Sequence, residues 1–151
     1  MPSVLAAAAF ALGTLVAANA QTGLPVVTVR APQAALHLEV ARTEAERETG
    51  LMGRAALAPH TGMLFVFDQD GPIAFWMKDT LVPLDMVFLA SDGTVRTIYA
   101  GVATVPPSLP DDAIPREAGF AKYVIELPAG EAERDGIGVG TRLGVPDAVH
   151  A

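Results

Sequence analysis

The pattern of apolar and polar positions along the chain predicts mostly short strands. In the segment LHLEV, residues 36–40, the apolar residues alternate with His37 and Glu39, which is typical of a strand with one buried face. Residues 26–30 (VVTVR) predict another short strand before it. This part of the chain therefore indicates β-structure.

Four strand-like runs follow in quick succession, and two of them are apolar on both faces. They are Met63–Phe67, Ile73–Lys78, Leu84–Ala90 and Val95–Val102. The dipeptide Asp92-Gly93 separates the last two runs and favours a tight hairpin, because glycine accepts positive φ. We expect an antiparallel meander in which the MLFVF and MVFL runs are central strands covered on both sides.

Two segments predict short helices. Thr43 followed by Glu46 is the signature of a capping box, which predicts a helix from Glu44 to Met52 that ends at Gly53. The segment AGEAERDG, residues 129–136, predicts a second short helix, whose acidic residues we expect on the solvated surface.

The rest of the chain adds two strands and one long loop. KYVIEL (122–127) and TRLGV (141–145) predict strands, whereas residues 104–119 contain four prolines and fit no regular element. A loop of that length in a small domain is often a functional lid or an ordered crossover. The predicted fold is mainly β: a meander curling into a barrel-like or two-layer sheet with one or two short helices.

The first 20 residues resemble a secretory signal. The uncharged run Val4–Ala18 precedes Ala20, and Ala18-Asn19-Ala20 fits the small-x-small cleavage pattern. An uncleaved anchor is the alternative, but the run is shorter than the roughly 20 apolar residues of a spanning helix. We therefore expect a signal peptide (1–20), an N-terminal extension (21–35), one β-rich domain (36–146) and a short tail (147–151). The processed protein is expected to be periplasmic or extracellular and not an integral membrane protein.

Charge and composition narrow the classes of partner. The net charge of −7 argues against nucleic acid, because phosphate binding needs clustered Lys and Arg. The chain has no Cys, which excludes disulfides, thiolate catalysis and zinc–thiolate sites. A secreted domain of this size without disulfides depends on its hydrophobic core.

Polar residues interrupt the most apolar region, FWMKDTLVPLDMVFL (75–89). If this stretch alternates as a strand, Phe75 and Met77 face the core while Trp76 and Lys78 share the other face. An indole beside an ammonium can stack on a flat ring or sugar while the ammonium pairs with an anion. The candidate ligand-binding residues are Arg54, Trp76, Lys78, Asp79 and Asp85, and we expect Asp85 to lie close to Lys78 or Arg54.

Three interpretations of this group remain open from the residues alone. The charged side chains could form ion pairs that tie strands to the helix, because buried charges must be paired. They could line a binding patch for a small molecule or glycan, flanked by the Pro-rich loop. They could also form a glycan-type hydrolase in which Asp79, Asp85 or Glu126 supply general acid and base. Neither Ser91 nor Ser108 lies in a nucleophile elbow.

No pattern of metal ligands emerges, so no metal or cofactor is expected. The histidines, His37, His60 and His150, lack zinc-binding spacing and fit surface, loop and tail positions. The soft thioethers after the signal could bind Cu(I), but each lies in an apolar run where methionine usually fills the core. These residues are Met52, Met63, Met77 and Met86.

Several motifs in their order resemble one family. They are GLMGR, GMLFVF, FWMKDT followed by PLD, YVIELPAG and GIGVG. Together they are similar to the bacterial and archaeal family called domain of unknown function 192, over roughly residues 36–145. The resemblance implies a small, often exported, mostly-β domain and no established activity. Its polar positions correspond here to Arg54, Lys78, Asp79, Thr80, Asp85 and Glu126. The predicted function is an exported binding or accessory module of the cell envelope, with the hydrolase as the alternative.

Overall fold

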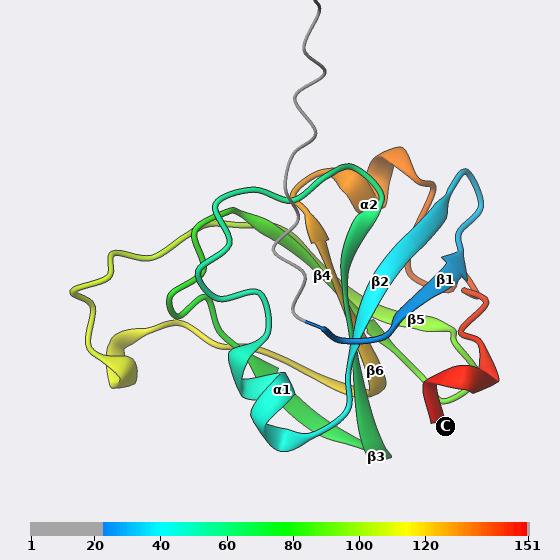
Figure 1. Cartoon of the computed structure of the whole chain (residues 1–151), viewed down its shortest axis with the longest axis horizontal. Coiled ribbons are helices and arrows are strands. Elements are labelled where there is room, and N and C mark those ends of the chain that lie inside the picture. Colours follow the sequence, from blue (N-terminus) through cyan, green and yellow to red (C-terminus); the bar gives the residue numbers. More distant parts are fainter. Residues whose placement is uncertain (1–22, 151) are drawn as a thin grey trace, which may run out of the picture.

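One six-stranded sheet organises the computed structural model, which describes residues 23–150 (Figure 1). The strands are β1 Val26–Arg30, β2 Ala35–Ala41, β3 Thr61–Phe75, β4 Leu84–Leu89, β5 Val95–Val102 and β6 Glu117–Pro128. The helices are α1 Glu44–Thr49 and α2 Glu131–Arg134, with 3₁₀ turns at Asp111–Ala113 and Asp147–His150. The mainly-β prediction with minor helix content is confirmed.

The order of the strands differs from a simple meander. It is β1-β2-β3-β6-β4-β5, with β2 and β3 parallel and the other neighbours antiparallel. The predicted run 63–67 and the first three residues of the run 73–78 belong to the single long strand β3, which ends at Phe75 and whose register shifts between Val66 and Gly71. Strand β6 begins inside the predicted loop and lies between β3 and β4, so these two strands are not neighbours. Only β4 and β5 form the expected hairpin.

The hairpin turn shows why glycine is needed there. Gly93 has φ 84°, and a Cβ added to it would lie 2.4 Å from the carbonyl oxygen of Leu143. That carbonyl belongs to the C-terminal segment, which makes isolated bridges with both sides of the sheet. Gly144 pairs with Arg30 at the end of β1, and Arg142 pairs with Thr94 just before β5. The predicted last strand is therefore a tether, and the sheet remains open.

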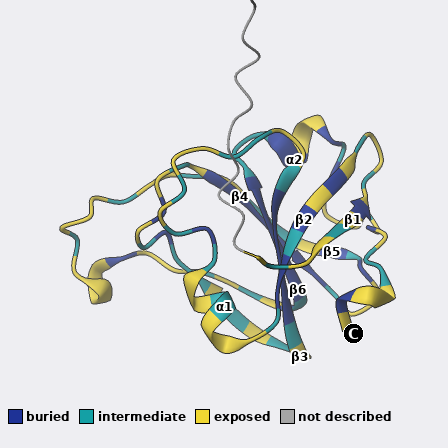
Figure 2. Ribbon diagram, viewed as in Figure 1, coloured by how far each residue is buried: buried dark blue, intermediate teal, exposed yellow. Residues whose placement is uncertain are grey.

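Two hydrophobic cores cover the two faces of the sheet, as the doubly apolar runs predict. The central strands are dark blue in Figure 2, which marks buried residues. Leu64, Val87 and Ile125 point to the core that includes Ala132 of α2, here called the α2-side core. Their neighbours along the strands point to the opposite core, which includes Leu51 after α1 and is here called the α1-side core. Residues one apart on β3, β4 or β6 therefore face different environments.

Helix α1 begins as predicted and ends early. The side chain of Thr43 accepts the Glu46 N–H, and the Glu46 carboxylate accepts the Thr43 N–H at 2.9 Å. The helix ends at Gly50, whose φ of 46° suits glycine, rather than at Gly53. Gly53 has φ 76° and turns the chain again, and its N–H bonds the carbonyl of Asp79 at 2.9 Å.

Both ends of the described chain are integrated into the sheet. Strand β1, within the predicted N-terminal extension, pairs with β2 from Val26 to Arg30. Val149, in the predicted tail, is fully buried in the α2-side core. The predicted signal peptide lies outside the described residues. Within residues 23–150, no helix has the length and apolar character needed to cross a membrane.

Candidate functional site

The chain leaves β3 at Phe75 and makes a turn that carries the predicted polar residues. Met77 is buried in the α1-side core and Phe75 packs against it, as alternation predicts. Trp76 and Lys78 are half-buried. Asp79 is exposed and has φ 49°, a left-handed conformation that Asp tolerates better than most residues. The polar residues therefore lie in a turn at the end of a strand, not along its face.

The Pro-rich loop contacts this turn. The Arg116 guanidinium lies 4.1 Å from the centroid of the Trp76 ring, and the Lys78 ammonium lies 5.2 Å from it. The same ammonium pairs with Asp111 at 2.7 Å. In Figure 1 this loop extends from the sheet at the left of the view. Cation–π contacts with the chain's own residues therefore occupy part of the indole surface that the sequence offers to a ligand.

A backbone hydrogen bond holds the segment that contains Arg54 beside Asp79. The Gly53 N–H to Asp79 carbonyl bond holds the segment after α1 against the Trp76–Asp79 turn. The Arg54 guanidinium itself pairs with Glu39 on β2. The structure thus places Arg54, Trp76, Lys78 and Asp79 in one region, with Arg54 and Lys78 engaged in ion pairs.

Asp85 does not join this group, so the expectation that it lies beside Lys78 or Arg54 is corrected. It is fully buried, and its carboxylate accepts N–H groups of Gly101 at 2.8 Å and Ala132 at 2.9 Å. In the β4–β6 register Asp85 is opposite Leu127, a member of the α2-side core. Its side chain therefore faces α2 and links that helix to β5, on the other side of the sheet.

A small hollow of about 30 Å³ opens between the end of α1 and the Trp76 turn. Its buried wall comprises Leu51, Phe65, Thr80 and Glu126, and exposed Glu48 and Thr49 contribute to its rim. A broader, shallow hollow beside it extends to Lys78 and shares Glu48, Thr49, Met52 and Trp76. The candidate site is therefore a narrow recess that continues into a surface groove.

Glu126 is a buried acidic residue in the wall of this recess. It is 5% exposed, and its carboxyl has no hydrogen-bond or ion-pair partner among residues 23–150. Burial raises the pKa of Glu126 to about 8, so the carboxyl is protonated at neutral pH. A protonated carboxyl donates one hydrogen bond and accepts others. The sequence signal for this residue is a lone acid at an inward position of the apolar run YVIEL.

The register separates Glu126 from Asp85. Glu126 is opposite Met63 on β3 and Met86 on β4, and both methionines belong to the α1-side core. The two carboxyl groups thus lie on opposite faces of the sheet. Three of the four methionines considered for copper, Met63, Met77 and Met86, are buried in the same core, whereas Met52 lines the recess.

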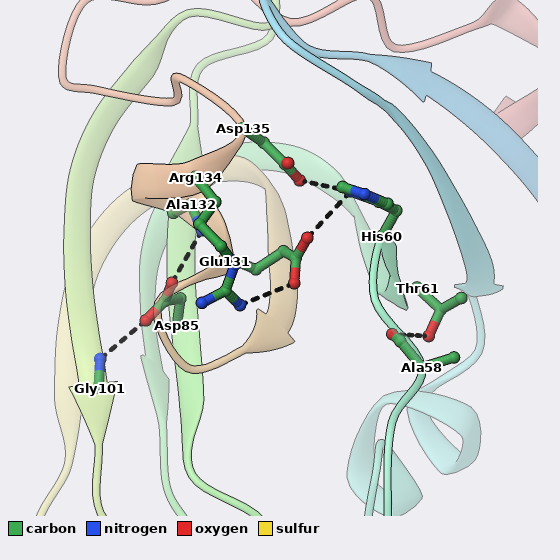
Figure 3. A network of polar contacts seen from close by, with 9 residues as sticks. All are labelled: Ala58, His60, Thr61, Asp85, Gly101, Glu131, Ala132, Arg134 and Asp135. Atoms are coloured by element: carbon green, nitrogen blue, oxygen red, sulfur yellow. Dashed lines mark hydrogen bonds and ion pairs between the residues drawn. The ribbon is translucent and has the colours of Figure 1, made fainter.

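Two acidic residues of α2 and its end are buried, contrary to the expected solvated surface. Glu131 and Asp135 are each 2% exposed, and both contact the ring of His60 (Figure 3). The i, i+4 spacing of the two acids places them on one face of a helical turn, which is the signal that sequence analysis missed. His60 is distant in sequence and gave no such signal.

Comparisons with known proteins place this fold among uncharacterised relatives. A crystal structure from Sinorhizobium meliloti 1021, of a protein described as a candidate transcription regulator, is 42% identical, with a TM-score of 0.67, covering 80% of this chain and 93% of that one. A protein of unknown function from Novosphingobium aromaticivorans DSM 12444 is 30% identical, with a TM-score of 0.71, covering 81% and 86%. Comparison with curated proteins gives no match. The model of the family DUF192, described as "Uncharacterized ACR", matches residues 26–145. The chain belongs to the DUF192 family.

Proposed function

We propose that this protein is an exported, non-catalytic binding module that holds a small uncharged ligand bearing hydroxyl or carbonyl groups. The observation that carries the proposal is Glu126, a residue 5% exposed in the wall of the recess whose carboxyl has no partner among residues 23–150. No fully enclosed side-chain nitrogen or oxygen of those residues lacks a hydrogen-bond partner, so this carboxyl reaches the space of the recess, where a ligand can meet it. Perturbed groups of this kind in a recess are candidates for functional sites.

The walls of the recess support a ligand that is partly apolar. Leu51, Phe65 and Phe75 give it hydrophobic sides, and the protonated Glu126 offers a donor and an acceptor inside it. A neutral hydroxyl or carbonyl satisfies that carboxyl without introducing a buried charge. A cationic group would favour its ionised form instead.

The size of the recess favours a small ligand or one end of a larger one. The recess encloses only about 30 Å³, far below the about 300–1,000 Å³ of usual ligand pockets, so it suits a single hydroxyl or carbonyl group of a ligand rather than a whole sugar ring. The adjoining groove runs past Met52 and Trp76 to Lys78 and could hold the rest of the ligand outside the recess. A glycan end is therefore the ligand class that fits both spaces.

The positions of the carboxyl groups weigh against the hydrolase alternative. Glycoside hydrolysis needs two carboxyl groups about 5–10 Å apart flanking one bond. Asp85 faces the α2-side core and is bonded to two backbone N–H groups, so it cannot pair with Glu126 across a substrate. Of the carboxyl groups named in that alternative, Asp79, exposed in the turn before Thr80, remains as a partner for Glu126, and Glu48 on the rim of the recess is a further carboxyl.

A ligand screen of wild type and E126Q tests the proposal. The purified chain is heated with a panel of neutral mono- and disaccharides, including N-acetylated sugars, because a ligand that binds only the folded state raises Tm. We expect at least one sugar to raise Tm of the wild type and of the control E133Q, whose residue is exposed on α2, and to bind E126Q more weakly. A panel that shifts none of the proteins, or shifts E126Q equally, contradicts the proposal. Cleavage of the bound sugar that is lost in D79N would favour the hydrolase instead.

The description of the Sinorhizobium relative as a candidate transcription regulator suggests DNA as another partner. The charge distribution does not support this for the present chain. Arg54, Lys78 and Arg96 are paired with carboxylates, the net charge is −7, and the two α-helices have only six and four residues. DNA binding usually requires unpaired cations clustered on one face and often a longer recognition helix.

Export is the second part of the proposal, and it rests on the apolar run Val4–Ala18 followed by Ala20. Expression of the full chain in a bacterium, followed by fractionation and mass spectrometry of its N-terminus, tests it. We expect periplasmic or secreted material that begins at Gln21. A full-length chain retained in the cytosol contradicts export, and a full-length chain in the membrane fraction favours the uncleaved anchor.

A further inference from the structure

His60, Glu131 and Asp135 form a convergent group on the opposite side of the sheet from the recess. His60 lies just before β3, Glu131 opens α2, and Asp135 follows it. The His60 Nδ1 atom is 2.9 Å from the Glu131 Oε1 atom and 3.1 Å from the Asp135 Oδ2 atom. One ligand atom from each residue lies within 4.8 Å of the other two. Figure 3 shows both carboxylates pointing to the same ring atom.

One ring nitrogen cannot donate a hydrogen bond to both of these carboxylates. A ring nitrogen carries at most one hydrogen, yet two carboxylate oxygens face Nδ1 at hydrogen-bond distance. In the part of the chain that the structure describes, His60 is the only side chain that contacts the Asp135 carboxylate, which is 3% exposed. The Arg134 guanidinium pairs with Glu131 and also attracts Asp135 and Asp85, so one exposed cation serves three buried carboxylates. A cation between the three ligand atoms would add positive charge where the carboxylates outnumber it.

We propose that His60, Glu131 and Asp135 bind a divalent first-row transition metal ion such as Mn²⁺ or Zn²⁺. Two donor atoms that each lie about 2.1 Å from an octahedral ion and at right angles to each other are about 3.0 Å apart. The two contacts of the His60 Nδ1 atom, 2.9 and 3.1 Å, equal that separation, which is also the length of an ordinary hydrogen bond. The two carboxylate oxygens lie within 4.8 Å of each other and share an ion when they are about 4.2 Å apart or closer. One imidazole nitrogen and two carboxylate oxygens form a mixed donor set that suits such ions better than soft Cu(I).

The surrounding contacts hold the two acids in place. The Glu131 Oε2 atom accepts a bond from Arg134 at 2.9 Å, which leaves Oε1 directed to His60. The Asp85 carboxylate binds the Ala132 N–H, and the Gln33 N–H donates to the Asp135 carbonyl at 3.1 Å. Outer contacts of this type orient metal ligands and typically change affinity 10- to 100-fold. Asp85 is therefore a positioning residue for this group.

The group is accessible from one side. The His60 side chain is 46% exposed, whereas both acids are buried. An ion can enter past the ring, and water can occupy the remaining coordination positions. The site faces the α2-side core, since Ala132 between the two acids packs into it. Metal binding here is thus independent of a ligand in the recess.

Direct titration of the chelator-treated full chain with Mn²⁺ and with Zn²⁺ tests the proposal. Isothermal calorimetry should give one ion per chain for the wild type. H60N and D135N should bind at least about 10-fold more weakly, because each loses a ligand. Asparagine is chosen at position 60 because it tolerates the left-handed φ of 57°. E133Q, altered at an exposed acid of the same helix, should bind as the wild type does.

A second measurement does not depend on the variants folding. Mn²⁺ broadens NMR signals of nearby nuclei, so the ring signals of His60 should broaden in the wild type at ion concentrations that leave those of His37 and His150 sharp. Broadening at the other histidines, binding that is equal in D135N, or no binding at millimolar Mn²⁺ and Zn²⁺ would overturn the proposal. In the last case the contacts between the His60 ring and the two acids are sufficient to explain the group.

Discussion

The substitution E126Q should remove a loss of folding stability that the wild type suffers as pH rises. The pKa of Glu126 rises from 4.5 to about 8 on folding because the carboxyl is buried without a partner. Between these two values the unfolded carboxyl is ionised and the folded one is protonated, so the unfolded state binds fewer protons. Stability therefore falls as pH rises through this window and levels off above about pH 8.

The size of this change in the free energy of unfolding follows from the shift in the pKa of Glu126. Each pH unit within the window lowers the free energy of unfolding by about 1.4 kcal/mol, which amounts to about 3 kcal/mol at pH 7 and about 5 kcal/mol above pH 8. Glutamine is nearly isosteric and remains neutral, so E126Q lacks this slope. All other titrating groups contribute equally to both proteins, and the difference between the proteins isolates Glu126.

Urea unfolding at pH 5, 6, 7 and 8, followed by Trp76 fluorescence and circular dichroism, measures the effect. The stability of E126Q relative to the wild type should increase by about 1.4 kcal/mol per pH unit between pH 5 and 8. E133Q, at an exposed position, should follow the wild-type profile. A constant difference between E126Q and wild type across this range would refute the reasoning, because it would mean that Glu126 ionises in the folded protein as it does in the unfolded one.

Three further substitutions test the structural assignments by chemical denaturation. T43A removes the acceptor of the capping box and should cost about 1 kcal/mol, whereas S91A, in an exposed turn, should have little effect. G62A should destabilise by several kcal/mol or prevent folding, since its Cβ would lie 1.9 Å from the Glu126 carbonyl oxygen; G71A, with open space around it, should not. D85A should cost about 2–5 kcal/mol because it leaves the N–H groups of Gly101 and Ala132 without their acceptor, while D79N at the exposed turn should change stability by less than about 0.5 kcal/mol. Equal losses in D85A and D79N would contradict the assignment of Asp85 to a structural role.

Local chemistry in the sequence was sufficient to predict the local elements. The Thr43–Glu46 pair specified the start of α1, and Asp92-Gly93 specified the β4–β5 hairpin, because both depend on residues close together in the chain. The doubly apolar runs indicated central strands, since burial on two faces leaves a continuous hydrophobic signal. The insertion of β6 between β3 and β4 depends on long-range pairing that no local pattern encodes.

The candidate site was predictable only in part for the same reason. The motif around Trp76 and Lys78 did indicate the turn beside the recess. Which face Asp85 takes depends on its register with Leu127, and that register is set by β6. The importance of Glu126 depends on α1 and the Trp76 turn leaving its carboxyl unpaired, which is a property of their packing. His60 and Asp135 are 75 residues apart, so their contact exists only in the folded chain.

The C-terminal tether has a consequence for aggregation. The free edges of an open sheet present backbone groups that another chain can pair with. Gly144 and Arg142 occupy backbone positions beside β1 and β5, which are the two edges. This segment is translated after every strand of the sheet, so a nascent chain exposes both edges until residues 142–144 emerge. The interval before the tether docks is when two copies of this protein are most able to pair with each other.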